Sequence, residues 1–200
     1  MNFRSIPLTA WIGMVGIAIA VLAAAFAPWL APFGENQVVG NPWEPASQAY
    51  PLGLDNLGRD LLSRMIYGAR MTLFVSVCAT VLAFSLGVVL SFTAAVMRGF
   101  VDMGLSRLND LMMSIPTLIF ALIVLAALPQ NLFVLIVVMA VLDSTRVFRI
   151  GRALAGDIAV MDFVEAARLR GEKTLWIVFR EILPNAMTPL LSEFGLRLAF

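Results

Sequence analysis

The sequence predicts an all-α, polytopic helical membrane protein, and three observations indicate this fold. Hydrophobic residues make up 60% of the chain and charged residues 14%, and the mean hydropathy of +0.91 lies far above that of a soluble globular domain. The apolar residues form long uncharged blocks, which are separated by short clusters of arginine and aspartate. A chain of 200 residues fits one membrane domain, and a formal net charge of +1 argues against a general binder of nucleic acids.

The first uncharged block runs from Thr9 to Ala27 and predicts a membrane span, since about 20 apolar residues cross a hydrocarbon core of about 30 Å. A cleaved signal peptide is the competing interpretation, because Ala25-Phe26-Ala27 resembles a cleavage site. The block is long for such a signal, only Arg4 precedes it, and Pro28 would follow the cut. We therefore interpret residues 1–33 as an uncleaved N-terminal anchor.

Residues 34–67 are rich in proline, glycine and charged residues, and they predict a loop outside the membrane. Within this loop, the segment from Asp55 to Asp60 is acidic enough to suggest a calcium site. It lacks the spacing of acidic residues and glycine that wraps oxygen ligands around the ion. A capped turn that leads into a helix explains the segment better, so we assign no metal ligands.

The next uncharged block, Met71 to Met97, predicts a second span, in which Gly87 favours close helix packing. The block from Leu111 to Leu142 holds roughly 32 residues, which exceeds one crossing. Pro129-Gln130-Asn131 therefore predicts a tight hairpin between a third and a fourth span. Pro116 is expected to kink the third span.

A fifth apolar segment begins after Pro184, and about 16 residues remain before Phe200. That length is too short for a comfortable crossing of the bilayer. We therefore interpret residues 68–200 as a partial membrane core and expect the fold to be C-terminally incomplete, with the fifth helix completed in a longer parent protein.

The distribution of lysine and arginine predicts the orientation, because positively charged residues are retained in the cytoplasm. With the N-terminus in the cytoplasm, the outer side receives only Arg59, Arg64 and Arg70. The inner side then receives Arg4, Arg98, Arg107, Arg146, Arg149, Arg152, Arg168, Arg170, Lys173 and Arg180. The sequence therefore predicts residues 34–67 outside and a cytoplasmic loop over residues 151–184.

Residue usage excludes most familiar enzyme chemistry. Histidine is absent and Cys78 is the only cysteine, which excludes an intrachain disulfide, a zinc cluster of cysteine and histidine, and histidine-based catalysis. The only lysine lies in Gly171-Glu172-Lys173-Thr174, which lacks the glycine that directly precedes the lysine of a phosphate-binding loop. We therefore predict no enzymatic site, no catalytic residue and no cofactor in this chain.

The predicted cytoplasmic loop contains Glu165-Ala166-Ala167-Arg168-Leu169-Arg170-Gly171, followed by Ile182-Leu183-Pro184. This pattern resembles the signature of the permease subunits of bacterial ATP-binding-cassette (ABC) importers, in which Glu-Ala-Ala, three residues and glycine precede an Ile-x-Leu-Pro-like element. Glu181 stands where isoleucine is usual, and Ile182 follows one place later. That shift resembles the dipeptide, oligopeptide and nickel subgroup of these permeases.

A second segment strengthens this resemblance. The stretch from Pro51 to Arg64, followed by Tyr67-Gly68-Ala69-Arg70, resembles the segment before the second span in the same subgroup. The resemblance implies the transmembrane domain of a type I importer in the bacterial inner membrane, which moves peptides, nickel or related small solutes. It also implies a second permease subunit, two ATP-binding subunits that hydrolyse the ATP, and an extracytoplasmic substrate-binding protein.

The residues of the loop motif suggest a docking element on physical grounds as well. Asp157 to Arg170 is expected to form a helix, in which Ala166 and Ala167 allow another backbone to approach closely. Gly171 is expected to close this helix in the left-handed conformation. Thr174 is then expected to cap a second short helix that carries Leu175, Trp176 and Phe179.

The apolar side chains of these two helices need either the membrane surface or a partner protein. A helix pair lying in the membrane interface is the first possibility. The family resemblance favours the second, in which a coupling helix docks on an ATP-binding subunit through Glu165, Ala166, Ala167 and Gly171.

Asp143 and Arg146 stand three residues apart near the inner end of the fourth span and are expected to share a helix face and to pair. Because charged residues within spans are functional candidates, we consider both for a pathway or gate, although they lie close enough to the interface to reach water. An ion-coupled secondary transporter is the main alternative function, but it would need ionisable residues near the bilayer midplane. A structural membrane anchor is a further alternative, and it would not explain the motif at Glu165.

Overall fold

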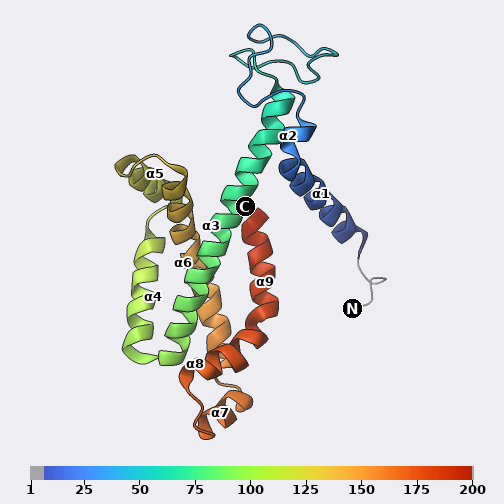
Figure 1. The fold of residues 1–200 in the computed structure, drawn as a ribbon. Coiled ribbons are helices and arrows are strands. Elements are labelled where there is room, and N and C mark those ends of the chain that lie inside the picture. Colours follow the sequence, from blue (N-terminus) through green and yellow to red (C-terminus); the bar gives the residue numbers. More distant parts are fainter. Residues whose placement is uncertain (1–6, 200) are drawn as a thin grey trace. The chain divides into compact units, whose positions relative to one another are not determined.

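The computed structural model describes residues 7–199, and in this range the chain is helical apart from loops and two isolated β-bridges (Figure 1). The all-α prediction is therefore confirmed. The helices are α1 (Leu8–Ala25), α2 (Ala27–Leu30), α3 (Leu61–Met97), α4 (Gly99–Ser114), α5 (Thr117–Ala127), α6 (Leu132–Ile158), α7 (Asp162–Leu169), α8 (Thr174–Ile177), the π-helical turn η2 (Val178–Ile182) and α9 (Leu183–Ala199).

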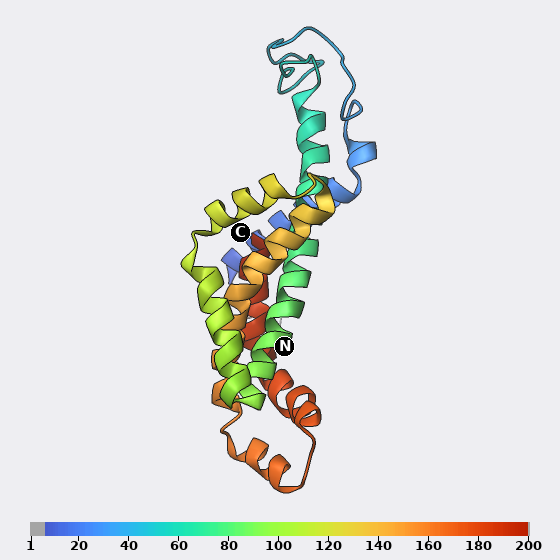
Figure 2. The same cartoon turned by 90° about the vertical axis from the view of Figure 1, so that its left-hand side faces the viewer.

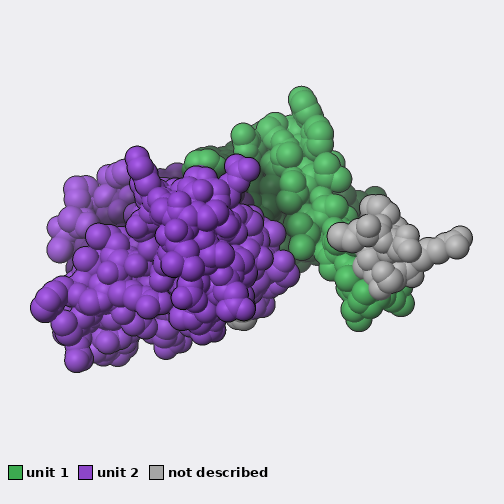
Figure 3. Space-filling model, turned by 90° about the horizontal axis from the view of Figure 1, so that it is seen from below, with its two compact units in different colours: residues 1–75 green, residues 76–200 purple. Residues whose placement is uncertain are grey.

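The chain divides into two compact units, residues 1–75 and residues 76–200 (Figure 3). The first unit contains α1, α2, the long loop and the beginning of α3. The second unit contains the rest of α3 and all later helices.

Two of the described helices are long and apolar enough to cross a membrane, α1 with 18 residues and α3 with 37. The pair α4 and α5 meets the same test as a single bent span. With 27 residues, α6 is long enough to cross a membrane, but Asp143, Arg146 and Arg149 follow directly after its apolar first part. The sequence predicts four complete spans, whereas two or three described spans meet the length and composition test.

The third predicted span differs most from the structure. The helix begins at Gly99 rather than near Leu111, and Pro116 breaks it completely instead of kinking it, so that α4 and α5 meet at an angle of 89°. Ile115 before the proline is extended, with φ −93° and ψ 130°. Proline disfavours the helical conformation of the preceding residue and has no N–H to donate, so the helix ends here.

In the second unit, α6 packs against α3, α4, α5 and α9 (Figures 1 and 2). Gly87 of α3 makes the closest approach to α6, because a Cβ at this position would lie 2.6 Å from the Cβ of Val147 and 2.9 Å from the carbonyl oxygen of Ser144. Phe84 of α3 also packs edge-to-face on Phe194 of α9, with 5.1 Å between the ring centroids. The close packing predicted for Gly87 is present.

The most deeply buried core of the second unit lies where α3, α6, α7, η2 and α9 meet. Its fully buried members include Ala155, Val164, Ala167, Ile182 and Ala186. Burying such side chains stabilises packing by about 25 cal/mol per Å² of apolar surface. The short helix α7 is therefore fixed to the end of the bundle by its own buried face.

In the first unit, Asp55 organises the loop that precedes α3. Its Oδ1 accepts hydrogen bonds from the N–H groups of Leu57 (2.8 Å) and Arg59 (3.0 Å), and its Oδ2 accepts from the side chains of Arg59 (2.9 Å) and Arg64 (2.6 Å). Burial would raise the pKa of Asp55, but these N–H groups and guanidinium groups together hold it well below its usual range. The carboxylate stays charged at any physiological pH.

Asp60 caps the N-terminus of α3. Its Oδ2 accepts hydrogen bonds from the backbone N–H (2.8 Å) and the hydroxyl (2.6 Å) of Ser63, and the Ser63 hydroxyl accepts one from the N–H of Phe33 (3.1 Å). The capped turn predicted from the sequence is confirmed.

Candidate docking site on the loop between α6 and α9

The helix that carries the Glu165 motif is α7, and it begins later than the sequence suggests. Asp157, expected at its start, is the second-last residue of α6, and a turn over residues 159–161 separates the two helices. The N–H groups of Val164 and Glu165 bond to the carbonyl oxygen of Met161. α7 is therefore eight residues long, and it lies at the end of the second unit beyond the turn between α3 and α4 (Figures 1 and 2).

Gly171 closes α7 with a complete Schellman motif. Its φ is +81°, and its N–H donates a hydrogen bond of 2.9 Å to the carbonyl oxygen of Arg168. The N–H of Glu172 donates a hydrogen bond of 3.2 Å to the carbonyl oxygen of Ala167. The left-handed conformation expected from the sequence is present. No atom lies within 4 Å of a Cβ built on Gly171, so the surface beside this turn is open.

The two alanines of the motif have different environments. Ala167 is fully buried against the core, on the same face of α7 as Val164, three residues earlier. Ala166 and Glu165 lie on the exposed face. The expectation that both alanines serve close approach by another protein therefore does not hold for Ala167, whose small side chain packs within its own chain.

The exposed apolar residues around α7 include four to which the sequence analysis assigned no role. Leu169 is 83% exposed, Val160 is 68% exposed, and Met161 and Phe163 are also exposed. Val164 and Ala167 are three residues apart and share the inner face, whereas Leu169 follows Ala167 by two residues and therefore lies on the outer face, so helical periodicity could have found Leu169. Together with Glu165 and Ala166, these apolar side chains form a mixed surface, which is typical of a protein interface.

Charge is distributed along α7 in the direction that its helix dipole favours. Asp162 and Glu165 lie in the first turn and Arg168 in the last. Arg170, just past the end, lies 3.9 Å from Glu181 of η2. A depression of about 360 Å³ beside Glu165 is lined by Arg98, Arg168 and Leu169, among others. The exposed surface thus combines apolar residues, the carboxylates of Asp162 and Glu165, and several guanidinium groups.

The second helix of the loop is part of a longer helix. α8, η2 and α9 follow one another without interruption from Thr174 to Ala199, and Lys173, not Thr174, is the N-cap residue. The π-helical turn η2 precedes Pro184, which has no N–H to donate to the preceding turn. In the same turn, the side-chain amide of Asn185 donates a hydrogen bond of 2.6 Å to the carbonyl oxygen of Glu181.

Asp143 and Arg146 form the expected pair on one face of α6, with 3.7 Å between their closest charged atoms. Both are partly exposed, and the contact is loose. Fifteen residues of helix separate Asp143 from the end of α6, which corresponds to about 22 Å along the axis. The structure therefore does not bring this pair to the surface of α7.

A stronger ion pair, which the sequence did not reveal, joins α4 to α6. The guanidinium group of Arg152 binds both carboxylate oxygens of Asp102, with 2.6 Å between one terminal nitrogen and Oδ2 and a second bond from Nε to Oδ1. Fifty positions separate the two residues in the chain. A bidentate pair of this kind fixes orientation as well as distance.

Comparison with known families agrees with this geometry. The family described as "Binding-protein-dependent transport system inner membrane component" matches residues 87–200, which is more than half of the chain and includes all of α7. The chain belongs to this family. A second family, described as "N-terminal TM domain of oligopeptide transport permease C", matches residues 9–49 and so covers α1 and the start of the loop.

Curated relatives carry matching names. A putative peptide transport system permease protein of Brucella suis is 38% identical over 90% of this chain and 61% of its own length. The di/tripeptide transport system permease protein DppC of Pseudomonas aeruginosa is 33% identical over 90% of this chain and 62% of its own. The oligopeptide transport system permease protein OppC of Bacillus subtilis is 31% identical over 98% and 64%. The chain spans about three fifths of the length of these relatives.

Proposed function

We propose that this chain acts as a permease subunit of an ABC importer, which takes up peptides, nickel or related small solutes with ATP hydrolysed in separate subunits. The observation that carries this proposal is α7, a short helix that is fixed at the end of the bundle by a buried face and exposes Glu165, Ala166 and Leu169. The family to which the chain belongs and the names of its relatives support the peptide class among these solutes.

The proposed partners follow from the same assignment: a second permease subunit, two ATP-binding subunits and an extracytoplasmic substrate-binding protein. The exposed surface of α7 would dock on an ATP-binding subunit. A turn of three residues joins α7 to α6, and both contribute to one buried core. A displacement of α7 would therefore pass into α6 and along the membrane domain, as in rigid-body switching between inward and outward access.

We further propose that the N-terminus and the loop that contains α7 lie in the cytoplasm, since most basic residues fall on that side. In a Cys78→Ser background, Asn36→Cys should react with a membrane-impermeant thiol reagent from outside, because Asn36 is exposed in the loop of the first unit. Val160 is 68% exposed, and Val160→Cys should react only after the membrane is opened. The reverse labelling pattern would contradict both the orientation and the docking proposal.

Gly171→Asp tests the docking surface directly. The substitution should leave membrane insertion intact but abolish most uptake and uncouple ATP hydrolysis from substrate. A side chain in the left-handed region costs about 1 kcal/mol, and the carboxylate adds charge beside α7. Glu165→Ala should act more mildly, because water can partly replace an exposed carboxylate at an interface.

The protein is expressed from its own gene and reconstituted in vesicles together with its companion subunits. Uptake and substrate-stimulated ATP hydrolysis are then compared between the unsubstituted protein and Gly171→Asp. Gly171→Asn is the matched control, because asparagine has nearly the same size, carries no charge and tolerates the left-handed conformation. It should retain most activity. Unchanged uptake and stimulation in Gly171→Asp would mean that Gly171 is not the turn of a coupling element.

A further inference from the structure

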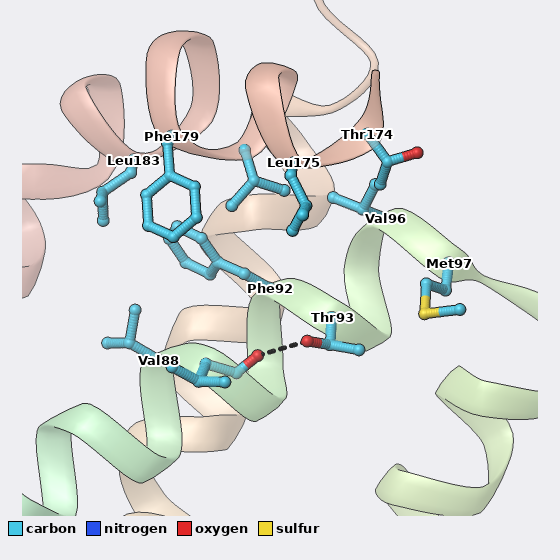
Figure 4. A pocket seen from close by; sticks show the side chains of 11 residues that line it. Val88, Phe92, Thr93, Val96, Met97, Thr174, Leu175, Phe179 and Leu183 are labelled. Atoms are coloured by element: carbon cyan, nitrogen blue, oxygen red, sulfur yellow. Dashed lines mark hydrogen bonds between the residues drawn. The ribbon is translucent and has the colours of Figure 1, made fainter.

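An apolar groove in the second unit lies between α3 and the segment formed by α8 and η2 (Figure 4). Its volume is about 170 Å³. Val89, Phe92 and Met97 line it from α3, and Leu175, Phe179 and Leu183 line it from the other side. The polar lining side chains are those of Thr93 and Thr174, and the Thr93 hydroxyl is satisfied within α3 by the carbonyl oxygen of Val89, at 2.7 Å.

The walls of this groove are open in the described chain. Leu175 is 71% exposed, Phe179 is 64% exposed, and Val89 and Met97 are similarly exposed. Contiguous apolar surface of this kind marks a binding site or a contact with the membrane. Because the groove is next to the end of a membrane-spanning helix, hydrocarbon is available to fill it.

The size of the groove restricts what it can hold. A cavity of about 150 Å³ lined by apolar side chains accepts a molecule such as benzene, so 170 Å³ suits a short length of hydrocarbon chain. A helix with its side chains is about 10–12 Å across and would not enter a groove of this volume. The dimensions therefore favour a single acyl chain over a helix of another protein.

The two ends of the groove differ in polarity. Thr174 and Met97 lie at one end, and Val88 and Leu183 lie at the other (Figure 4). Exposed Lys173 directly precedes Thr174, and exposed Arg98 directly follows Met97, where the apolar part of α3 ends. The basic residues are thus at the end that reaches the membrane surface, although half-buried Glu172 is also near in sequence.

An apolar slot below a basic rim is complementary to one kind of molecule. A lipid places its acyl chains in the hydrocarbon and its headgroup at the surface, and basic residues beside the cytoplasmic face attract anionic headgroups. We infer that the groove binds one acyl chain of an anionic phospholipid of the cytoplasmic leaflet, with the headgroup beside Lys173. Only the choice of leaflet rests on the orientation proposed above.

The bound lipid has a structural consequence. Its chain contacts α3 on one side and both α8 and η2 on the other, and η2 shares the buried core with α7. The lipid therefore tightens the connection between the membrane helix and the loop that carries the docking site.

Native mass spectrometry of the purified protein in detergent tests this inference, with titrations of phosphatidylglycerol and phosphatidylcholine of identical chains. The protein should bind one phosphatidylglycerol with about fivefold higher affinity than phosphatidylcholine, the preference that one lysine near the membrane surface provides. Lys173→Gln should lower this preference, because only Arg98 then remains at the basic end of the groove. Arg107→Gln, which removes an exposed basic residue of α4 outside the groove, should leave it unchanged.

Variants of the groove itself separate binding in the slot from binding elsewhere. Val89→Trp fills the slot and should remove the bound lipid of either kind, whereas Leu82→Trp, at an exposed position of α3 outside the groove, should not. Leu175→Asn changes a side chain that is 71% exposed, so the fold should be kept while lipid binding weakens. Helical content by circular dichroism checks that each variant is folded.

In the isolated protein, three outcomes would overturn the inference: no stoichiometric lipid, equal affinity for both lipids, or unchanged binding in Val89→Trp and Leu175→Asn. Loss of the lipid when the other subunits assemble on the protein would also overturn it, because another chain would then occupy the groove. The assay requires neither transport nor ATP hydrolysis, so its result is independent of the proposed function.

Discussion

Gly87→Leu is expected to separate α3 from α6 and to remove most of the folded protein from the membrane. Even the first carbon of a side chain would lie 2.6 Å from the Cβ of Val147 and 2.9 Å from the carbonyl oxygen of Ser144. Because one of these neighbours is backbone, rotation of a side chain cannot relieve the clash. Extra methylene groups in a packed core lower the stability by about 1–3 kcal/mol, and a clash with backbone is expected to lie in the upper part of that range.

Thermal unfolding of the purified protein in detergent and the yield of monodisperse protein measure this effect. Gly68→Leu is the matched control, because Gly68 lies on the same helix and no atom is within 4 Å of a Cβ built there. A second variant, Gly87→Ala with Val147→Gly, removes the main side-chain contact and should recover part of the stability lost in Gly87→Ala. Equal melting temperatures for Gly87→Leu and Gly68→Leu would show that the close approach of α3 and α6 contributes nothing.

Reversal of one charge in the pair between Asp102 and Arg152 is expected to be the second large effect. Arg152→Asp would place two carboxylates where the structure has a bidentate ion pair, so that α4 loses a fixed contact with α6 and gains a repulsion. The Arg152 side chain is 43% exposed, so solvent screening limits the contribution of the ion pair to stability to about 1 kcal/mol. In Arg152→Asp, the repulsion between the two carboxylates adds to the loss of this contribution.

The exchange of both residues separates the pair from local effects. Asp102→Arg combined with Arg152→Asp should restore most of the stability that either single reversal removes, whereas two unrelated substitutions would add their costs. Arg149→Asp, at an exposed position one turn earlier in α6, controls for added negative charge. Melting temperatures in low and high salt complete the test, because salt should reduce the penalty of the single reversals. Equal stability of the single and double variants would mean that the pair does not join α4 to α6.

Several features of the fold could be predicted because they depend on local composition. The first span was predicted over Thr9 to Ala27 and is α1, Leu8–Ala25. The end of α3 at Met97 was also predicted, since Arg98 follows it. The start of α3 was not predicted. An uncharged block indicates only the part of a helix that can lie in hydrocarbon, whereas α3 begins before the block, at the cap that Asp60 provides.

The candidate site shows the same division. The turn at Gly171 could be predicted because a glycine after a helix satisfies the last carbonyl groups through its own backbone conformation. The burial of Ala167 could not, because it depends on which face of α7 meets Ile182 and Ala155. The pair between Asp102 and Arg152 likewise depends on the packing of α4 against α6, and no short pattern in the sequence encodes it.

The break between α4 and α5 has a consequence for the path of water through the membrane domain. A helix that stops leaves carbonyl groups at its end without partners, and the next helix starts with free N–H groups. The hydroxyl of Ser114 donates a hydrogen bond of 2.7 Å to the carbonyl oxygen of Leu111 and so satisfies only one of the carbonyl groups in the last turn of α4, and Pro116 has no N–H to offer. The hydrocarbon chains of lipids cannot form hydrogen bonds with such groups. If α4 and α5 cross the bilayer as one bent span, the break at Ile115 must therefore face a wet passage or another protein chain.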